Sequence, residues 1–145
     1  TPPDGAVEVK QLTFGAKSAL TGKTCPDFEL VTLDGKSITR AALKGQTILL
    51  QFGLGTDDEM FPAELAYRAL RGNGLHVVYV APIRVNADNY SVPVAIDQRS
   101  AVAGKFGMHS GMVLIDRFGR IAYTGASSSS SYQGLAQALQ DAGVW

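Results

Sequence analysis

Residues 47–56 read TILLQFGLGT, and this stretch decides the fold. Its first six residues form an apolar run of strand length, without the alternation of apolar and polar side chains that a half-exposed strand shows. Such runs are typical of strands buried on both faces, so we expect residues 47–52 to be a central strand of a sheet. Gly53 and Gly55 then interrupt the run.

An amphipathic helix is predicted directly after this strand. Residues 56–59 read TDDE, which is the chemistry of a helix start, and glycines at 72 and 74 close the pattern. Pro62 lies either in the first turn or at a kink near the start of the helix. The apolar residues that recur at helical spacing are Phe61, Leu65, Ala66, Ala69 and Leu70.

The first part of the chain predicts a β-hairpin. Residues 28–33 alternate in polarity before Asp34-Gly35, and residues 37–39 follow at hairpin distance. Residues 40–43 favour a short helix that ends at Gly45.

Further strands and helices follow from the same reasoning. Residues 83–91 lack helical periodicity and are expected to form a loop, so the middle crossover is shortened. The serine run at residues 127–131 is expected to be mobile. The predicted strands are residues 75–80, 92–96, 112–115 and 120–123, the last two joined in a hairpin; the predicted helices follow Asp97 and the serine run.

Together these elements predict an α/β sandwich in which helices flank a mixed central sheet. The chain has 145 residues, a usual size for one domain. We expect residues 24–145 to form that domain, with residues 1–23 as an N-terminal extension packed on or beside it.

Composition excludes several classes of function. Lys and Arg number 13 and Asp and Glu number 13, so there is no basic footprint for nucleic acid. The apolar runs are far shorter than the roughly 20 residues that cross a bilayer. The first residue is Thr1 and not Met, so we expect a removed signal or anchor and a periplasmic or other extracytoplasmic location.

Several short motifs in a fixed order resemble the thioredoxin-like superfamily. They are CPDFEL at residues 25–30, DGK at 34–36, LKG at 43–45, ILLQF at 48–52, VPVAID at 92–97 and LIDRFGRI at 114–121. The chain is most similar to the alkyl hydroperoxide reductase and thiol-specific antioxidant group and to the thiol-disulfide oxidoreductases of the bacterial cell envelope. The resemblance implies a thioredoxin-like sandwich with an N-terminal β-hairpin extension.

The cysteines of these families are absent from the matching positions. Asp57 and Met60 stand where the resemblance places the two cysteines of a Cys-x-x-Cys site, and Phe61 stands where peroxiredoxins carry their cysteine before Pro-Thr-Glu. Residues 106–112 contain no proline, although the resemblance implies a cis-proline loop there. Gly111 falls near the position of the peroxiredoxin arginine.

The charges at this helix start also disfavour thiol chemistry. A catalytic thiolate is stabilised by positive neighbours, whereas Asp57, Asp58 and Glu59 place three carboxyl groups there. We interpret these acids as residues that complement the helix dipole.

The leading hypothesis is a redox-inactive module that binds a protein or peptide and uses no cofactor. We expect no catalytic residue; if there is an activity, the resemblance implies a thiol-disulfide oxidoreductase or a peroxiredoxin-like enzyme. The predicted groove lies where this family docks substrate backbone, and its residues are Gly55, Thr56, Asp57, Met60, Phe61, Met108, His109 and Ser110.

Two alternatives use other residues. Cys25 is either a partly buried small residue or a lone thiol that forms a mixed disulfide, as in a single-cysteine oxidoreductase. A cuprous copper site is the other alternative, because imidazole and thioether are soft ligands. Its candidate ligands are Met60, Met108, His109 and Met112. His76 is expected to contact solvent or a backbone carbonyl.

Overall fold

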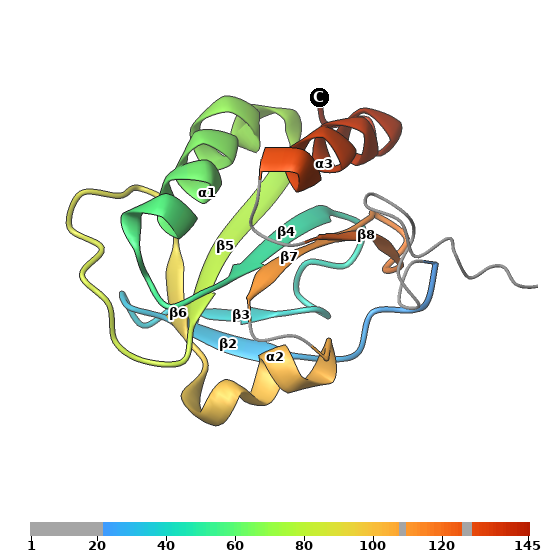
Figure 1. Ribbon diagram of the computed structural model, residues 1–145. Coiled ribbons are helices and arrows are strands. Elements are labelled where there is room, and N and C mark those ends of the chain that lie inside the picture. The colour runs from blue at the N-terminus through green and yellow to red at the C-terminus, as the bar shows by residue number, and fades with distance from the viewer. Residues whose placement is uncertain (1–21, 108–109, 126–128) are drawn as a thin grey trace, which may run out of the picture.

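The computed structural model describes residues 22–107, 110–125 and 129–145, and within them seven strands form one sheet (Figure 1). The strand order is β3-β2-β6-β5-β4-β7-β8. The strands are β2 (Glu29–Thr32), β3 (Ser37–Thr39), β4 (Thr47–Phe52), β5 (Leu75–Ala81), β6 (Val94–Ile96), β7 (Gly111–Ile115) and β8 (Ile121–Gly125). The helices are α1 (Asp57–Leu70), α2 (Ala101–Lys105) and α3 (Ser129–Asp141), and short 3-10 turns cover Arg71–Asn73 and Gln98–Ser100.

Strand β4 is central, as its apolar run predicts. It pairs in parallel with β5 on one side and antiparallel with β7 on the other, so the sheet is mixed. All six of its residues are buried. Towards one edge of the sheet, β6 pairs with β2 of the predicted first hairpin, and at the opposite edge β8 pairs with β7.

Helices cover both faces of the sheet. Helices α1 and α3 lie over one face and α2 lies over the other (Figure 1). The packing follows this division. Residues of α1 and α3 share one core cluster with Leu49 and Tyr79, and residues of α2 share the other with Leu50 and Phe52. The predicted mixed α/β sandwich is confirmed.

The shortened crossover is also confirmed. Residues 82–93, between β5 and β6, contain bends and one turn but no helix. Pro62 lies inside α1, in its second turn. Within the residues that the structure describes, no helix has the length and hydropathy that crossing a bilayer requires.

Two predicted segments, one helical and one a loop, differ from the structure. Residues 40–43 form successive hydrogen-bonded turns and no helix, because so few residues before Gly45 cannot offset the cost of nucleating one. The serine run at residues 127–131 was predicted to precede the last helix, but α3 begins inside the run, at Ser129. Residues 126–128 lie outside the described residues.

Asp97 starts α2 in a different way from the predicted one. A 3-10 turn with Arg99 and Ser100 at φ of 60° and 54° separates Asp97 from the helix, which begins at Ala101. The buried Asp97 carboxylate nevertheless accepts hydrogen bonds from the backbone N–H groups of Val102 and Ala103, at 2.9 Å each. It therefore accepts hydrogen bonds from N–H groups in the first turn of α2, although the 3-10 turn separates it from that helix along the chain.

Replacing Asp97 tests how much these hydrogen bonds contribute to the free energy of unfolding. Asp97→Ala leaves two buried N–H groups without their acceptor, so the free energy of unfolding should fall by about 2–3 kcal/mol. Urea unfolding followed by circular dichroism measures the change. Asp88→Ala, at an exposed carboxyl in the 82–93 loop, should change it by less than about 0.5 kcal/mol. Equal losses in the two variants would contradict the assigned role.

Candidate functional site

Three loops meet at the end of the central strands where β4 and β5 have their carboxyl ends, and we call this end the carboxyl edge. Phe52, the last residue of β4, is in register with Val80 of β5 and with Gly111, the first residue of β7. The loop after β4, the loop after β5 and the loop before β7 therefore begin or end together. The carboxyl ends of parallel strands are where open α/β sheets bind ligands, so this edge is the candidate site.

The loop after β4 is held tightly. The Gly53 N–H donates to the Val80 carbonyl at 3.0 Å, and the Gly55 N–H donates to the Tyr79 hydroxyl at 2.8 Å. Gly55 has a φ of +87°, and a Cβ atom there would lie 2.3 Å from Cγ1 of Val85. Only glycine fits, because both the backbone conformation and the contact with the neighbouring loop exclude a side chain.

Exposed apolar side chains gather near this edge. Leu54 is exposed in the loop after β4, Ile83 is exposed in the loop after β5, and Phe61 in α1 is 55% exposed. Thr56 and Ser110 are exposed as well. These residues come from all three loops and from the start of α1.

Other predicted groove residues are placed differently or lie outside the description. Met60 is 0% exposed, so its side chain is part of the core and is not offered to a partner. Helical geometry explains this, because Met60 and Ala63 lie three residues apart and both face the sheet. The Asp57 side chain and residues Met108 and His109 lie outside the described residues.

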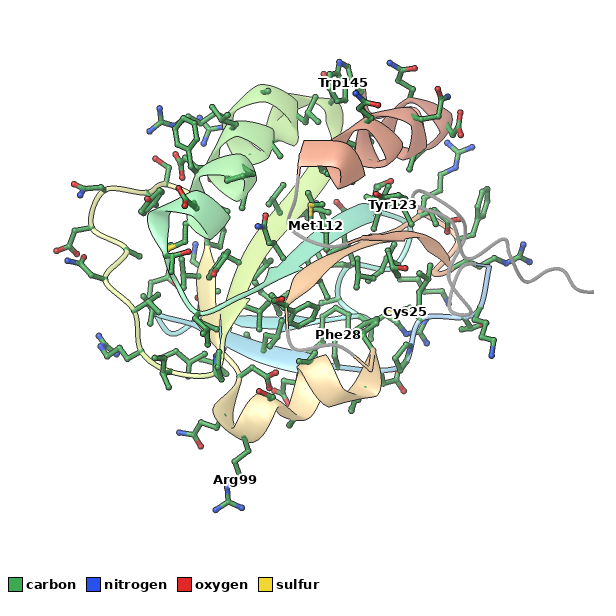
Figure 2. All side chains as sticks on the ribbon, in the orientation of Figure 1. Cys25, Phe28, Arg99, Met112, Tyr123 and Trp145 are labelled. Atoms are coloured by element: carbon green, nitrogen blue, oxygen red, sulfur yellow. The ribbon has the colours of Figure 1, made fainter. Side chains whose placement is uncertain are left out.

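The predicted copper ligands divide in the same way. Met60 and Met112 are both buried in the core cluster between the sheet and helices α1 and α3. Met112 lies above the sheet in Figure 2, on that side. Among the described residues, no group of three or more His, Cys, Asp or Glu side chains could hold a metal ion. His76 is half-buried and so reaches solvent, as we expected, and its ring also contacts the side-chain amide of Gln46.

Cys25 lies on the other face of the sheet from α1. It belongs to the core cluster that includes Phe28 and the α2 residues, and Figure 2 shows it beside Phe28. Its side chain is 2% exposed and its thiol donates to the Pro26 carbonyl at 3.2 Å. Burial raises the pKa of the Cys25 thiol to about 11, although the nearby Arg40 guanidinium acts to lower it.

Glu64 is a feature of the site region that the sequence analysis did not assign a role. Its carboxylate is buried and accepts hydrogen bonds from the backbone N–H groups of Ser91 and Val92, at 2.7 and 2.8 Å. The guanidinium of Arg68, one turn along α1, also donates to it. Glu64 therefore ties α1 to the loop that follows β5.

The pKa of Glu64 reflects two opposing effects. Burial alone would raise the pKa of this carboxyl, but the hydrogen bonds from Val92, Arg68 and Ser91 outweigh burial and hold the pKa below its ordinary value of 4.5. The carboxyl group is thus ionised at neutral pH. The sequence shows a glutamate in the frame Phe-Pro-Ala-Glu, but its two backbone donors, Ser91 and Val92, come from a loop far along the chain.

The chain is similar in fold to several solved structures. A candidate thiol:disulfide interchange protein DsbE from Chlorobium tepidum is 21% identical with a TM-score of 0.72, over 86% of this chain and 99% of that one. Peroxidoxin BcpB from Mycobacterium tuberculosis is 19% identical with a TM-score of 0.69, over 86% and 97%. The exposed lipoprotein thioredoxin Etrx1 from Streptococcus pneumoniae is 20% identical with a TM-score of 0.65, over 80% and 99%.

The chain therefore has a thioredoxin-like fold, as its motifs predict. It is similar both to thiol-disulfide oxidoreductases and to a peroxiredoxin-type protein, yet its one cysteine rules out a Cys-x-x-Cys pair. No protein-family profile matches the chain, and no curated protein sequence matches it.

The burial of Cys25 predicts slow thiol chemistry. With a pKa of about 11, roughly one thiol in a thousand is ionised at pH 8, and the side chain is shielded from solvent. Ellman's reagent should label the native chain at least about a hundred times more slowly than the chain in guanidinium chloride. Labelling of the native chain as fast as that of the unfolded chain would show an exposed thiol.

The Glu64 contacts predict a pH-dependent stability difference. Glu64→Gln should lower the free energy of unfolding at pH 7 by about 1–3 kcal/mol, because a charged acceptor for two backbone donors is lost. Since the folded pKa lies below 4.5, the contribution is present above that value and is lost as pH falls through the folded pKa. Urea titrations at several pH values should show the two proteins converging in acid, and a constant difference would refute the assignment.

Proposed function

We propose that the chain is a redox-inactive, thioredoxin-like module that binds a protein or peptide at the carboxyl edge of β4 and β5. The observation that carries the proposal is at the start of α1. There the matching positions of the catalytic cysteines hold Asp57, the buried Met60 and the exposed Phe61, while the only thiol is buried on the opposite face of the sheet.

The absence of a suitable thiol supports redox inactivity. Thiol-disulfide exchange and peroxide reduction both begin with attack by a thiolate. Burial raises the pKa of Cys25 to about 11, and its side chain is 2% exposed. A second cysteine to resolve a mixed disulfide does not exist in the sequence. The reading of Cys25 as a catalytic thiol is therefore not favoured.

The exposed side chains support binding. Leu54, Phe61 and Ile83 present apolar surface near the strand ends, where a partner can bury it. The loop beneath them is held by hydrogen bonds from Gly53 and Gly55, so little ordering is needed when a partner binds. Aromatic side chains such as that of Phe61 are enriched in the buried cores of protein interfaces.

The location outside the cytoplasm that the sequence suggests is part of this proposal. It is supported by the likeness in fold to a pneumococcal protein described as an exposed lipoprotein. Fractionation of the producing organism with an antibody against this chain would test it; recovery with the cytoplasmic proteins would contradict it.

A pair of phenylalanine variants tests the binding proposal. Peptides selected from a displayed random library against the immobilised chain should bind Phe61→Ser at least about tenfold more weakly than the native chain. Phe118→Ser is the matched control, because Phe118 is also exposed but lies in the β7–β8 turn, at the other end of β7 from Gly111. Its affinity should be unchanged, as measured by interferometry.

Two results would refute the proposal. The first is a library that yields no binder, or binders that respond equally to both variants. The second is insulin reduction with dithiothreitol that is faster in the presence of the chain than without it. Repeating that assay with Cys25→Ser would then show whether the buried thiol is responsible.

A further inference from the structure

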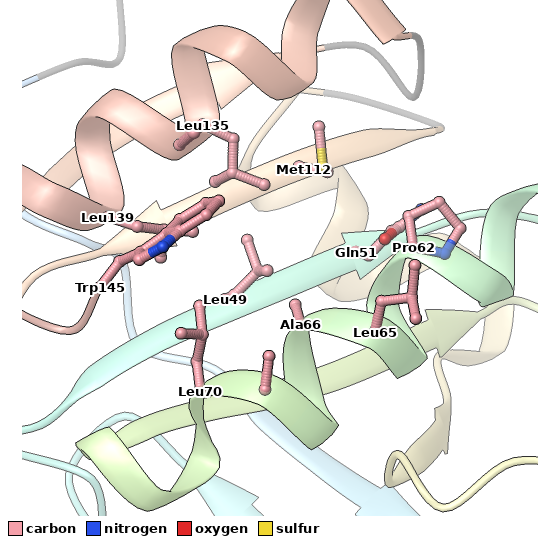
Figure 3. A pocket seen from close by; sticks show the side chains of 12 residues that line it. Leu49, Gln51, Pro62, Leu65, Ala66, Leu70, Met112, Leu135, Leu139 and Trp145 are labelled. Atoms are coloured by element: carbon pink, nitrogen blue, oxygen red, sulfur yellow. The ribbon is translucent and has the colours of Figure 1, made fainter.

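Two hollows of the described structure lie away from the proposed binding edge. One is an apolar groove between α1 and α3 beside Trp145 (Figure 3), and none of the twelve described residues that line it is charged. The other is a cavity of about 320 Å³ at the opposite end of β4 from the carboxyl edge, between residues 40–46 and the β7–β8 turn. The volume of this cavity falls in the range of small-molecule sites in proteins. The proposed function uses neither hollow.

The cavity beside the β7–β8 turn is rich in positive charge. Arg40 and Lys44 line it from the segment before β4, and Arg117 lines it from the β7–β8 turn. Asp116 is the one acid among its described lining residues. The Oδ1 atom of Asp116 already accepts hydrogen bonds from two backbone N–H groups of its own turn, at 2.9 and 3.0 Å. The lining therefore carries a surplus of positive charge.

The guanidinium of Arg40 is held in position at this cavity. Its Nε donates to Oδ1 of Asp27 at 3.0 Å, and a Cβ atom added at Gly119 would lie 3.1 Å from its Nη1. The contact with Asp27 uses Nε alone, so the donors on the two Nη atoms remain for a ligand. The Asp27 side chain is 86% exposed, so solvent screens the negative charge that it brings.

The other two cations of the cavity are exposed and have no carboxylate partner. Within the part of the chain that the structure describes, neither Lys44 nor Arg117 forms an ion pair. The guanidinium carbon of Arg117 lies 5.0 Å from the centre of the Phe118 ring, a contact that leaves its N–H donors unpaired with any acid. Like charges around one cavity repel one another, and a bound anion relieves that repulsion.

Apolar side chains complete the lining of this cavity. Ile48 of β4 and Ile115 of β7 are in register with each other, and both line it. Leu43 and Phe118 line it from the two turns, and Phe118 is 72% exposed. A ligand that fits this lining therefore combines a negative charge with an apolar portion that can cover exposed apolar surface.

From this chemistry we infer that the cavity binds a small phosphate monoester with an apolar body. A phosphate monoester carries about two negative charges at neutral pH, so it matches the surplus of positive charge better than a single carboxylate does. The planar guanidinium groups of Arg40 and Arg117 can each donate two hydrogen bonds to phosphate oxygens, and Lys44 adds a compact charge. The apolar body of the ligand lies against Leu43 and Phe118.

Phenyl phosphate is a suitable probe, since it joins one phosphate to one aromatic ring. Isothermal titration calorimetry with the full chain should show saturable binding of this probe. Phenol and inorganic phosphate should each bind at least about tenfold more weakly, because each lacks one of the two parts that the lining recognises. Raising sodium chloride from about 20 mM to about 300 mM should weaken phenyl phosphate binding several-fold, since salt screens charges at an exposed site.

Two pairs of variants connect this binding to the cavity. Lys44→Gln and Arg117→Gln should each weaken phenyl phosphate binding at least about fivefold, because each removes one positive charge from the lining. Both positions are exposed, so the urea midpoint should stay close to that of the native chain. Lys36→Gln and Arg84→Gln are the matched controls, because both residues are exposed and neither lines the cavity. Their affinities should be unchanged.

Several results would overturn the inference. They are the absence of saturable binding, phenol or inorganic phosphate that binds as tightly as phenyl phosphate, and cavity variants that bind like their controls. A peptide that contains phosphotyrosine supplies one more comparison. If it binds at least about tenfold more tightly than phenyl phosphate, the cavity recognises a modified protein and not a small molecule.

Discussion

The burial of β4 on both faces is the constraint on which the other elements depend. Ile48, Leu50 and Phe52 point into the cluster shared with α2, while Leu49 points towards α1 and α3, as the alternation of a strand requires. Both backbone edges of β4 are paired, with β5 and β7. Helices must therefore cover both faces, and the loop after Phe52 must leave at the edge where β5 ends and β7 begins.

At this edge the thioredoxin-like fold carries no cysteine at the start of α1. The loop that leads into α1 is held by hydrogen bonds from the backbone N–H groups of Gly53 and Gly55. The buried Glu64 connects α1 to the loop that follows β5. Sulfur at the start of α1 is present only as the thioether of Met60, which packs in the core. A scaffold that positions loops does not need a reactive group to bind a partner, since positioning and chemistry reside in different residues.

The accuracy of the sequence predictions follows the length of each pattern. Strands β4, β5 and β7 and helix α1 were predicted because each buries several residues whose spacing is visible in the chain. Residues 40–43 were wrongly predicted as helix because the segment is too short for periodicity to outweigh nucleation. The start of α3 at Ser129 was missed because serine alone indicates no helix. The turn at Arg99 and Ser100 was missed because non-glycine residues seldom adopt positive φ.

By itself the sequence determined that a dithiol cycle within this chain is impossible, since one cysteine cannot form a pair, and that a buried strand runs into an acid-rich helix start. Only the tertiary structure decided that Cys25 is shielded with a raised pKa, that Met60 faces the core, and that Glu64 finds its donors at Ser91 and Val92. The groove beside Trp145 is likewise a tertiary feature. The physical reason is common to all of them: burial and hydrogen bonding depend on elements far apart in the chain, whereas sequence patterns report only on near neighbours.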